Sequence, residues 1–390
     1  MGAGASILVL LVAGVASLFM AWVIGAGGSG ATPFAPAVGA NAISVMRAGF
    51  FVGILGLVGA VVQGGNVTQT VGTGLINGVT LTPMAVIVGL LTAAGLMAVG
   101  ILTGYPIATA FTVTGAIIGA GLALDGQPAW SKYTLIAAVW LLAPVVDGGI
   151  AYGLARTLPR EEVPERLSIP VLGALLGMVL ANVGFSFLGP AGESASLAAE
   201  AATSLAAEPT VARLGITLAL GAVVGLVVHW DVRRDEERGL RRFLLALGSL
   251  VAFSAGGAQV GLAVGPLLPL IGNTEISPTM VLFGGGAGLL VGSWTGAPRM
   301  IKSLSQDYSS LGPRRSISAL LPSFVMAQVA VFLGVPVSFN EIIVSAIVGS
   351  GLAVAGGGVS RAKLRNTVLA WVGSFVLAFA VGFAVLALAT

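Results

Sequence analysis

The chain has 390 residues, of which 56% are hydrophobic and only 8% are charged, and its mean hydropathy is +1.02. Soluble domains carry about 25% charged residues, so this composition excludes a soluble globular protein and predicts membrane helices along the whole chain. The net charge of +3 gives no indication of a nucleic-acid partner, and the absence of cysteine excludes disulfides and thiol chemistry.

The first apolar run ends in an unusual segment, AWVIGAGGSGATPFAPAVGAN, from Ala21 to Asn41. Glycine, proline and small polar residues interrupt the run, yet the segment carries no charge. Irregular backbone at membrane depth is tolerated only where protein buries it or where it lines a wet cavity. We therefore expect a broken helix here. The run before it lacks a basic n-region, which favours a retained first helix over a cleaved signal sequence.

Basic clusters mark the loops that follow, and the positive-inside rule places all of them in the cytoplasm. Even numbers of apolar runs separate successive clusters, and the connection between residues 189 and 209 holds three glutamates but no basic residue. That connection is expected to be external, as are both chain termini. The clusters are Arg156, Arg160 and Arg166; Arg233, Arg234, Arg238, Arg241 and Arg242; Arg299, Lys302, Arg314 and Arg315; and Arg361, Lys363 and Arg365.

Two pairs of segments about 230 residues apart share a pattern. The segment from Thr103 matches the one from Leu333, and GAGGSGAT from Gly25 matches GGAQVGLA from Gly256. Loops of the second half are basic and those of the first are nearly neutral, so the halves are expected to have opposite orientations. We predict an all-α polytopic membrane protein of about 12 membrane segments, with two inverted-topology repeats and re-entrant or broken helices. Residues 1–155 and 243–390 would form the repeats, and 156–242 two linking transmembrane helices with cytoplasmic basic loops.

The matched glycine-rich patches have two explanations. Small residues often allow close helix packing in membranes, which would be a purely structural role. Broken segments at matching positions of inverted repeats instead indicate a secondary transporter with a site near the membrane midplane. Four patches in two matched pairs favour the second explanation.

In the order and spacing of five motifs, the chain resembles the inorganic phosphate transporter (PiT) family over nearly its whole length. GAGGSGAT and GGAQVGLA correspond to the family's GANDVANA, and GGNVTQT from Gly64 corresponds to G-G-x-V-T-D-T. PIATAF from Pro106 and PVSFNE from Pro336 correspond to P-V-S-T-T-H. The resemblance implies a twelve-segment inverted-repeat fold with two re-entrant elements per half. It also implies uptake of an oxyanion, held between the halves and driven by Na⁺ or H⁺.

The chain departs from these motifs at its acidic positions. Gly28, Gln259 and Gln69 stand where the family has aspartate, and Glu341 replaces the histidine of the second P-V-S-T-T-H. A less acidic site repels a multiply charged anion less, but it also offers Na⁺ fewer charged oxygens. Oxyanion binding is therefore better supported than sodium coupling, and sulfate becomes a competitor for phosphate.

The expected oxyanion site lies between the two glycine-rich segments and is closed by the two proline-led tips, with Gln259 acting as a neutral hydrogen-bond donor. An acid within the membrane is a functional hypothesis by default, so Asp147 and Glu341 are candidates for the coupling ion; Gln69, at a position where the family has aspartate, is a third candidate. The substrate-binding candidates are Gly27, Gly28, Ser29, Thr109, Thr112, Gly257, Ala258, Gln259, Ser338 and Asn340.

Two function classes stay open from the sequence. One is a secondary transporter in the plasma membrane that carries phosphate or sulfate and is coupled to H⁺ or Na⁺. The other is a degenerate relative that binds an anion without coupled transport. No catalytic constellation and no histidine or cysteine cluster occurs, so we expect neither an enzyme nor a metal cofactor. A homodimer is compatible with the sequence.

Overall fold

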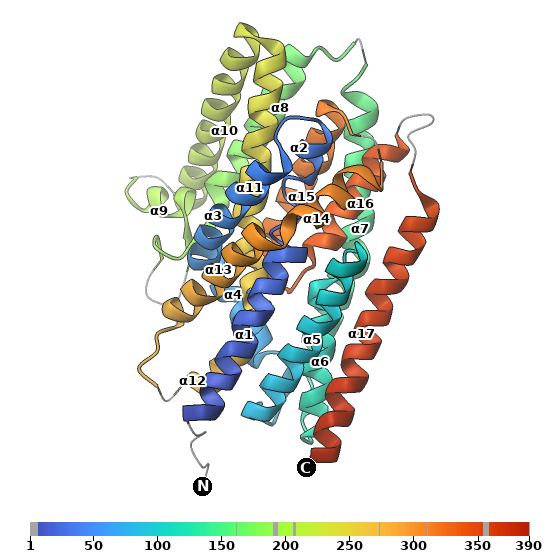
Figure 1. Ribbon diagram of the computed structural model, residues 1–390. Coiled ribbons are helices and arrows are strands. Elements are labelled where there is room, and N and C mark those ends of the chain that lie inside the picture. Colours follow the sequence, from blue (N-terminus) through green and yellow to red (C-terminus); the bar gives the residue numbers. More distant parts are fainter. Residues whose placement is uncertain are drawn as a thin grey trace.

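The computed structural model describes residues 7–160, 162–189, 194–205, 208–272, 274–309, 311–353 and 359–389, and most of them are helical (Figure 1). The helices of the first half are α1 (Ile7–Gly27), α2 (Ala35–Gly39), α3 (Val45–Gln63), α4 (Gly65–Thr73), α5 (Pro83–Thr103), α6 (Thr109–Ala123) and α7 (Trp130–Thr157). The linking segment forms α8 (Glu165–Asn182), α9 (Leu197–Thr203) and α10 (Pro209–Arg234).

The second half repeats this pattern of long and short helices. It contains α11 (Glu236–Val264), the 3₁₀ turn η1 (Gly265–Leu267), α12 (Leu268–Ile271), α13 (Pro278–Thr295), α14 (Ala297–Gln306), α15 (Pro313–Leu333), α16 (Phe339–Leu352) and α17 (Arg361–Ala389). Two short antiparallel strand pairs close loops: β1 (Ile76–Asn77) with β2 (Gln127–Pro128), and β3 (Gly184–Phe185) with β4 (Ala195–Ser196).

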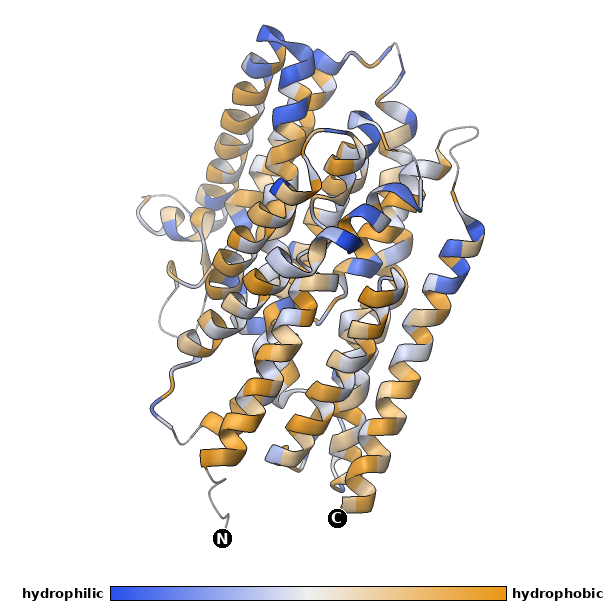
Figure 2. Ribbon diagram, viewed as in Figure 1, coloured by the Kyte–Doolittle hydropathy of each residue, from blue (hydrophilic) through white to orange (hydrophobic). Residues whose placement is uncertain are grey.

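The helices have the length and composition of membrane spans. Within the described residues, nine helices are long and apolar enough to cross a membrane, and α13 with α14 forms a further pair bent by 66°. The apolar helices α6 and α16 are shorter. Hydrophobic residues follow the length of these helices (Figure 2). Many large apolar side chains on them are exposed, as expected where lipid replaces water. The helical, polytopic class is confirmed, while the number of about twelve segments stays a prediction.

The start of α1 and the end of α17 lie at the same end of the molecule (Figure 1). The α7–α8 and α10–α11 connections lie at the opposite end, where hydrophilic residues gather (Figure 2). We call this opposite end the basic end, because it holds the arginines of both connections. That the basic end faces the cytoplasm stays a prediction.

Helices from the two halves pack on one another reciprocally. α6 packs along α17, and α16 packs along α7. In the same way α3 lies against α11, and α13 lies against α1. Two similar halves related by a two-fold axis would make such paired contacts, so the packing is compatible with the predicted repeat.

The two glycine-rich segments differ in structure. α1 ends at Gly27, and the buried residues 28–34 leave the helix, so the first break is confirmed. The break expected at Gly256 is wrong, because α11 continues as a helix to Val264. A Cβ on Gly256 would lie 1.9 Å from the carbonyl oxygen of Gly56. Glycine is present there because α11 and α3 cross in backbone contact, which is the close-packing explanation.

Candidate functional site

Two hairpins bring their tips into the middle of the molecule. α5 and α6 are joined through Gly104 at φ 74°, and α15 and α16 are joined through Gly334 at φ 62°. α5 and α15 therefore each end at a glycine in the left-handed conformation, which other residues rarely adopt. Extended residues led by Pro106 or Pro336 follow, and proline prevents either helix from continuing.

Each tip is held by a tryptophan from the other half. Trp371 Nε1 on α17 donates to the carbonyl oxygen of Pro106 at 2.7 Å. Trp140 Nε1 on α7 donates to the carbonyl oxygen of Pro336 at 2.8 Å. The two bonds match the reciprocal helix packing and fix both tips against the body of the protein.

The helices that follow the tips begin without a side-chain cap. Ala108 precedes α6 and has no group that could cap it, and the Ser338 hydroxyl before α16 makes no capping bond. The first N–H groups of a helix lack partners inside the helix and carry a partial positive charge. Two buried, uncapped N-termini from the two halves therefore form an environment that favours an anion.

Four side chains around these N-termini have buried oxygen atoms without a hydrogen-bond partner in the described part of the chain. All four residues are 0% exposed, which closes the group off from both ends of the molecule. We call Thr109, Gln259, Ser338 and Asn340 the central cluster; the unpaired atoms are Thr109 Oγ1, Gln259 Oε1, Ser338 Oγ and Asn340 Oδ1. Unpaired buried polar atoms are costly, so such a concentration points to a ligand.

Gly28 lies at the edge of the central cluster. A Cβ at this position would lie 2.9 Å from Gln259 Oε1 and 3.1 Å from Thr109 Oγ1. Gly28 and Gln259, which stand at the aspartate positions of the two glycine-rich motifs, are therefore neighbours in space. A glycine leaves the room that a side chain would fill.

Hydrogen bonds to main-chain carbonyls orient the two amides of the central cluster. Gln259 Nε2 donates to Val337 O at 3.3 Å, and Asn340 Nδ2 donates to Gly27 O at 3.0 Å and to Ile107 O at 2.7 Å. A carbonyl can only accept, so the nitrogen atoms must face the carbonyls and the amide oxygens face the cluster. We expected Gln259 to donate to the ligand; one of its two N–H hydrogens is bonded to Val337 O, and its unpaired Oε1 adds an acceptor to the cluster.

The remaining substrate-binding candidates lie around this cluster but contribute less to it. Thr112 Oγ1 is already bonded to Ala108 O at 2.9 Å and lies 3.1 Å from Ser374 Oγ. Gly257 packs against Gln63, since a Cβ on this glycine would lie 2.6 Å from the Cβ of Gln63. Ala258 is buried beside Gln259, and Ser29 is buried in the break after α1.

The three candidates for the coupling ion lie in different surroundings. Glu341 follows Asn340 on α16, is 2% exposed, and its carboxylate forms no hydrogen bond or ion pair within the described residues. Asp147 is fully buried on α7 and contacts Ser323. Gln69 is exposed on α4, where its side chain lies near Thr73, so the structure does not bring it to the cluster.

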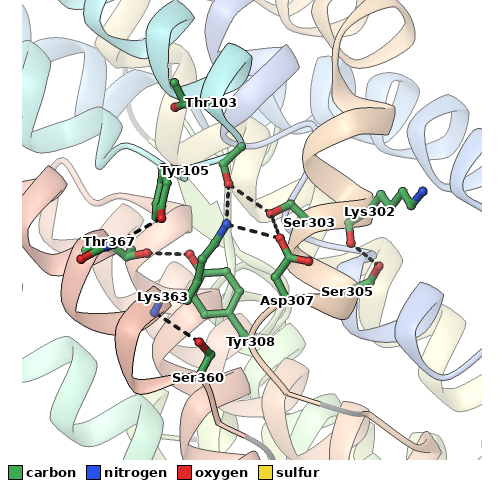
Figure 3. A network of polar contacts seen from close by, with 12 residues as sticks. Thr103, Tyr105, Lys302, Ser303, Ser305, Asp307, Tyr308, Ser360, Lys363 and Thr367 are labelled. Atoms are coloured by element: carbon green, nitrogen blue, oxygen red, sulfur yellow. Dashed lines mark hydrogen bonds and ion pairs between the residues drawn. The ribbon is translucent and has the colours of Figure 1, made fainter.

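A polar network that was not predicted from the sequence holds the first tip where it begins, at Gly104 (Figure 3). Lys363 Nζ at the start of α17 donates to Gly104 O at 3.1 Å and pairs with Asp307 Oδ2 at 3.3 Å. Ser303 Oγ lies 2.7 Å from the same Asp307 oxygen and 3.1 Å from Gly104 O. We call these residues the Lys363 latch.

Two tyrosines flank the Lys363 latch. The ammonium group of Lys363 lies 4.3 Å from the centre of the Tyr105 ring, a distance at which cation–π attraction acts. Tyr308 is buried beside it, 2.7 Å from Thr367 Oγ1. Burial raises the pKa of the Tyr308 hydroxyl well above its usual value, so the group stays protonated and uncharged.

Among the residues that the structure describes, those that contact the second tip are neutral. Asn66 Nδ2 on α4 donates to Val331 O at 3.3 Å, and a Cβ on Gly334 would lie 3.1 Å from Thr70 Oγ1. A separate cavity of about 200 Å³ lies between the end of α4 and α6, where it reaches Ile117, two turns along α6 from Thr109. The two tips are therefore held unequally: the first has a charged latch, and the second has contacts from neutral groups.

These features describe a polytopic membrane protein in which buried, uncharged polar groups of the central cluster meet at the tips of two hairpins. The family model described as the phosphate transporter family matches residues 8–382, so the chain belongs to that family. Within the described residues, no group of three or more histidine, cysteine or acidic side chains could hold a metal ion.

Similar proteins cover the chain almost completely. A Pyrococcus abyssi protein named "Putative phosphate permease" is 26% identical over 93% of each chain, and an identically named Helicobacter pylori protein is 27% identical over 88% of this chain and 68% of its own. The chloroplastic inorganic phosphate transporter 2-1 of Arabidopsis thaliana is 24% identical over 90% of this chain and 67% of its own. A solved structure titled as the sodium-dependent phosphate transporter has the same fold, with a TM-score of 0.82, 23% identity, and 98% and 99% of the two chains covered.

Proposed function

We propose that this protein is a secondary transporter that moves inorganic phosphate across the plasma membrane, coupled to a cation gradient. The observation that supports this most directly is the central cluster. Two buried, uncapped helix N-termini meet there beside four unpaired oxygens, and the groups come from both halves. Phosphate would bind between the two inverted repeats, 1–155 and 243–390, and alternate exposure of the site would require the hairpin tips to move.

The direction of the two amides supports phosphate over sulfate. Phosphate near neutral pH retains at least one P–OH group, which can donate to Gln259 Oε1 or Asn340 Oδ1. Sulfate has no such hydrogen and would place its negative oxygens against these acceptors. Sites that hydrogen-bond a substrate OH reject analogues without it by up to about 10⁴–10⁵-fold, so we expect sulfate to bind at least about 10²-fold more weakly.

We propose H⁺ as the coupling ion. The missing motif aspartates favour H⁺, because no charged oxygen remains in the central cluster itself. Na⁺ is the alternative, since neutral amide and main-chain oxygens can also ligate a hard cation and the structural relative is titled sodium-dependent. Glu341, next to the cluster, is available to either ion.

Purified protein in liposomes tests this function. We expect labelled phosphate to accumulate in response to an inward pH gradient without Na⁺, and excess sulfate to leave uptake unchanged. Replacing a cluster hydroxyl, as in Thr109→Val or Ser338→Ala, should weaken phosphate binding by about 0.5–1.5 kcal/mol each, or roughly 2- to 13-fold. Thr134→Val, on an exposed face of α7, is the matched control.

Three outcomes would count against parts of this proposal. Equal inhibition by sulfate would refute the role of the amide oxygens. Uptake that requires Na⁺ and ignores pH would assign coupling to Na⁺. Phosphate binding without transport would indicate a degenerate, anion-binding relative.

The proposed orientation places the basic end in the cytoplasm and both termini outside. The chain has no cysteine, so a single cysteine reports the side of the membrane cleanly. A cysteine at the exposed Ser204, in the connection between α9 and α10, should react with an impermeant maleimide added outside intact cells. Reaction only after the cytoplasmic side is opened would reverse the orientation.

A further inference from the structure

Asp147 is a buried carboxyl group outside the central cluster. It lies in the middle of α7, which packs against α15 and α16, and its side chain is 0% exposed. Ser323 Oγ on α15 lies 3.1 Å from Asp147 Oδ2, whereas Oδ1 has no hydrogen-bond partner in the described chain. The next residue, Gly148, meets α16 in backbone contact, since a Cβ on Gly349 would lie 2.1 Å from Gly148 O.

The hydrogen atoms at this contact can be counted. The Ser323 hydroxyl has one hydrogen but two acceptors in reach, namely Ala319 O at 2.8 Å and Asp147 Oδ2 at 3.1 Å. If the hydrogen lies on the shorter bond to Ala319, the contact between Ser323 and Asp147 needs a second hydrogen. A neutral Asp147 supplies it, because its own O–H then donates to Ser323 Oγ.

No cation balances a charge on Asp147 in the described structure. None of the charged or titratable groups on the packed helices forms a hydrogen bond or an ion pair with its carboxyl group. An ionised carboxylate that is buried without a partner costs several kcal/mol, which again favours the neutral acid in this closed arrangement. The groups concerned are Lys132, Tyr133, Tyr152 and Arg156 on α7, Arg314 and Arg315 on α15, and Glu341 on α16.

We propose that Asp147 is the proton-binding site that couples phosphate transport to the pH gradient; this rests on the function proposed above. Its proton is held while α7, α15 and α16 are packed together, and it passes to water when α7 separates from α15. The α15–α16 hairpin also carries Ser338 and Asn340 of the central cluster. Burying the protonated acid and completing the anion site are therefore parts of the same movement, which is what coupling requires.

The variant Asp147→Asn tests this role because it fixes the site in an uncharged form of nearly the same shape. Phosphate exchange between equal phosphate solutions needs no net proton movement, so it should stay within about twofold of the wild type. Accumulation driven by a pH gradient should be lost. Glu200→Gln, on the exposed α9, is the matched control and should retain both activities. Accumulation in Asp147→Asn equal to that of the wild type would overturn the proposal.

A spectroscopic readout separates this inference from the proposed function. Infrared difference spectra between acid and alkaline pH should contain the carbonyl stretch of a protonated, buried carboxyl group. We expect the band to disappear in Asp147→Asn and to remain in Glu341→Gln. A band that is lost only in Glu341→Gln would assign the proton to Glu341 and refute the role of Asp147. Wild-type protein that shows the band but exchanges no phosphate would refute the transport function and not the proton site.

Discussion

Replacing Gln259 by glutamate is the sharpest test of how the central cluster binds its ligand. A protonated glutamate has almost the shape of glutamine, and its O–H can replace the amide N–H that donates to Val337 O. One carboxyl oxygen would then remain where Gln259 Oε1 faces the cluster. At low pH the variant should therefore bind phosphate nearly as the wild type does.

At high pH the same variant should bind phosphate much more weakly. A phosphate oxygen in contact with residue 259 brings two negative charges within about 4 Å, where repulsion is about 4 kcal/mol at an effective dielectric constant of about 20. The bond to Val337 O is lost as well, which adds about 1 kcal/mol. A glutamate can limit this cost by keeping its proton, so the affinity should fall progressively, by up to about 10³-fold, as the pH rises.

The assay is equilibrium binding of labelled phosphate to the purified protein across a pH series. The wild type measured over the same series corrects for the titration of phosphate itself. The reasoning fails if Gln259→Glu and wild type have parallel affinities at every pH, because the side chain at residue 259 would then not face the ligand.

Two further predictions concern packing and the Lys363 latch. Gly256→Ala places a methyl group 1.9 Å from the main chain of α3, so it should destabilise the protein by about 1–3 kcal/mol or more and lower its melting temperature. The control is Gly284→Ala, whose methyl group would meet nothing within 4 Å and should leave the melting temperature unchanged. Equal melting temperatures would show that α11 and α3 do not cross closely. Lys363→Met removes the charged contact to the first tip, so a cysteine placed at Ala108 should react with maleimide several-fold more than it does without this change. The control Lys132→Met should leave this labelling unchanged. Unchanged labelling in Lys363→Met would show that the tip is held without the Lys363 latch.

Several features of the fold follow directly from the sequence. Uncharged glycine and proline after a long apolar run indicated the break behind α1, because only buried or wet backbone can be irregular within a membrane. The proline-led tips were placed correctly at Pro106 and Pro336, where proline follows a left-handed glycine and prevents the helix from continuing. The resemblance at these motifs brought Thr109, Ser338, Asn340 and Gln259 into one expected site, and the structure brings them together.

Other features depend on partners that are distant in the chain. The glycines around Gly256 have the composition of a broken segment, but the carbonyl group of Gly56 across the helix crossing makes them a packing surface. The direction of the Gln259 amide is fixed by Val337 O on a separate hairpin, so its role as an acceptor could not be derived from its own segment. For Gln69, the motif gave the position but not the face of α4 on which it lies.

The reciprocal tryptophan bonds constrain how the protein is made. Pro106 leaves the ribosome 265 residues before Trp371, the residue that completes its tip. Until α17 has been inserted, the face of α6 that packs on α17 is uncovered, and the α5–α6 hairpin lacks the helix that supports it. The fold of the first half is therefore completed only by the second half. A chain truncated before α17 would lose more than one helix, because the α5–α6 hairpin of the opposite half would be left without the tryptophan that holds its tip.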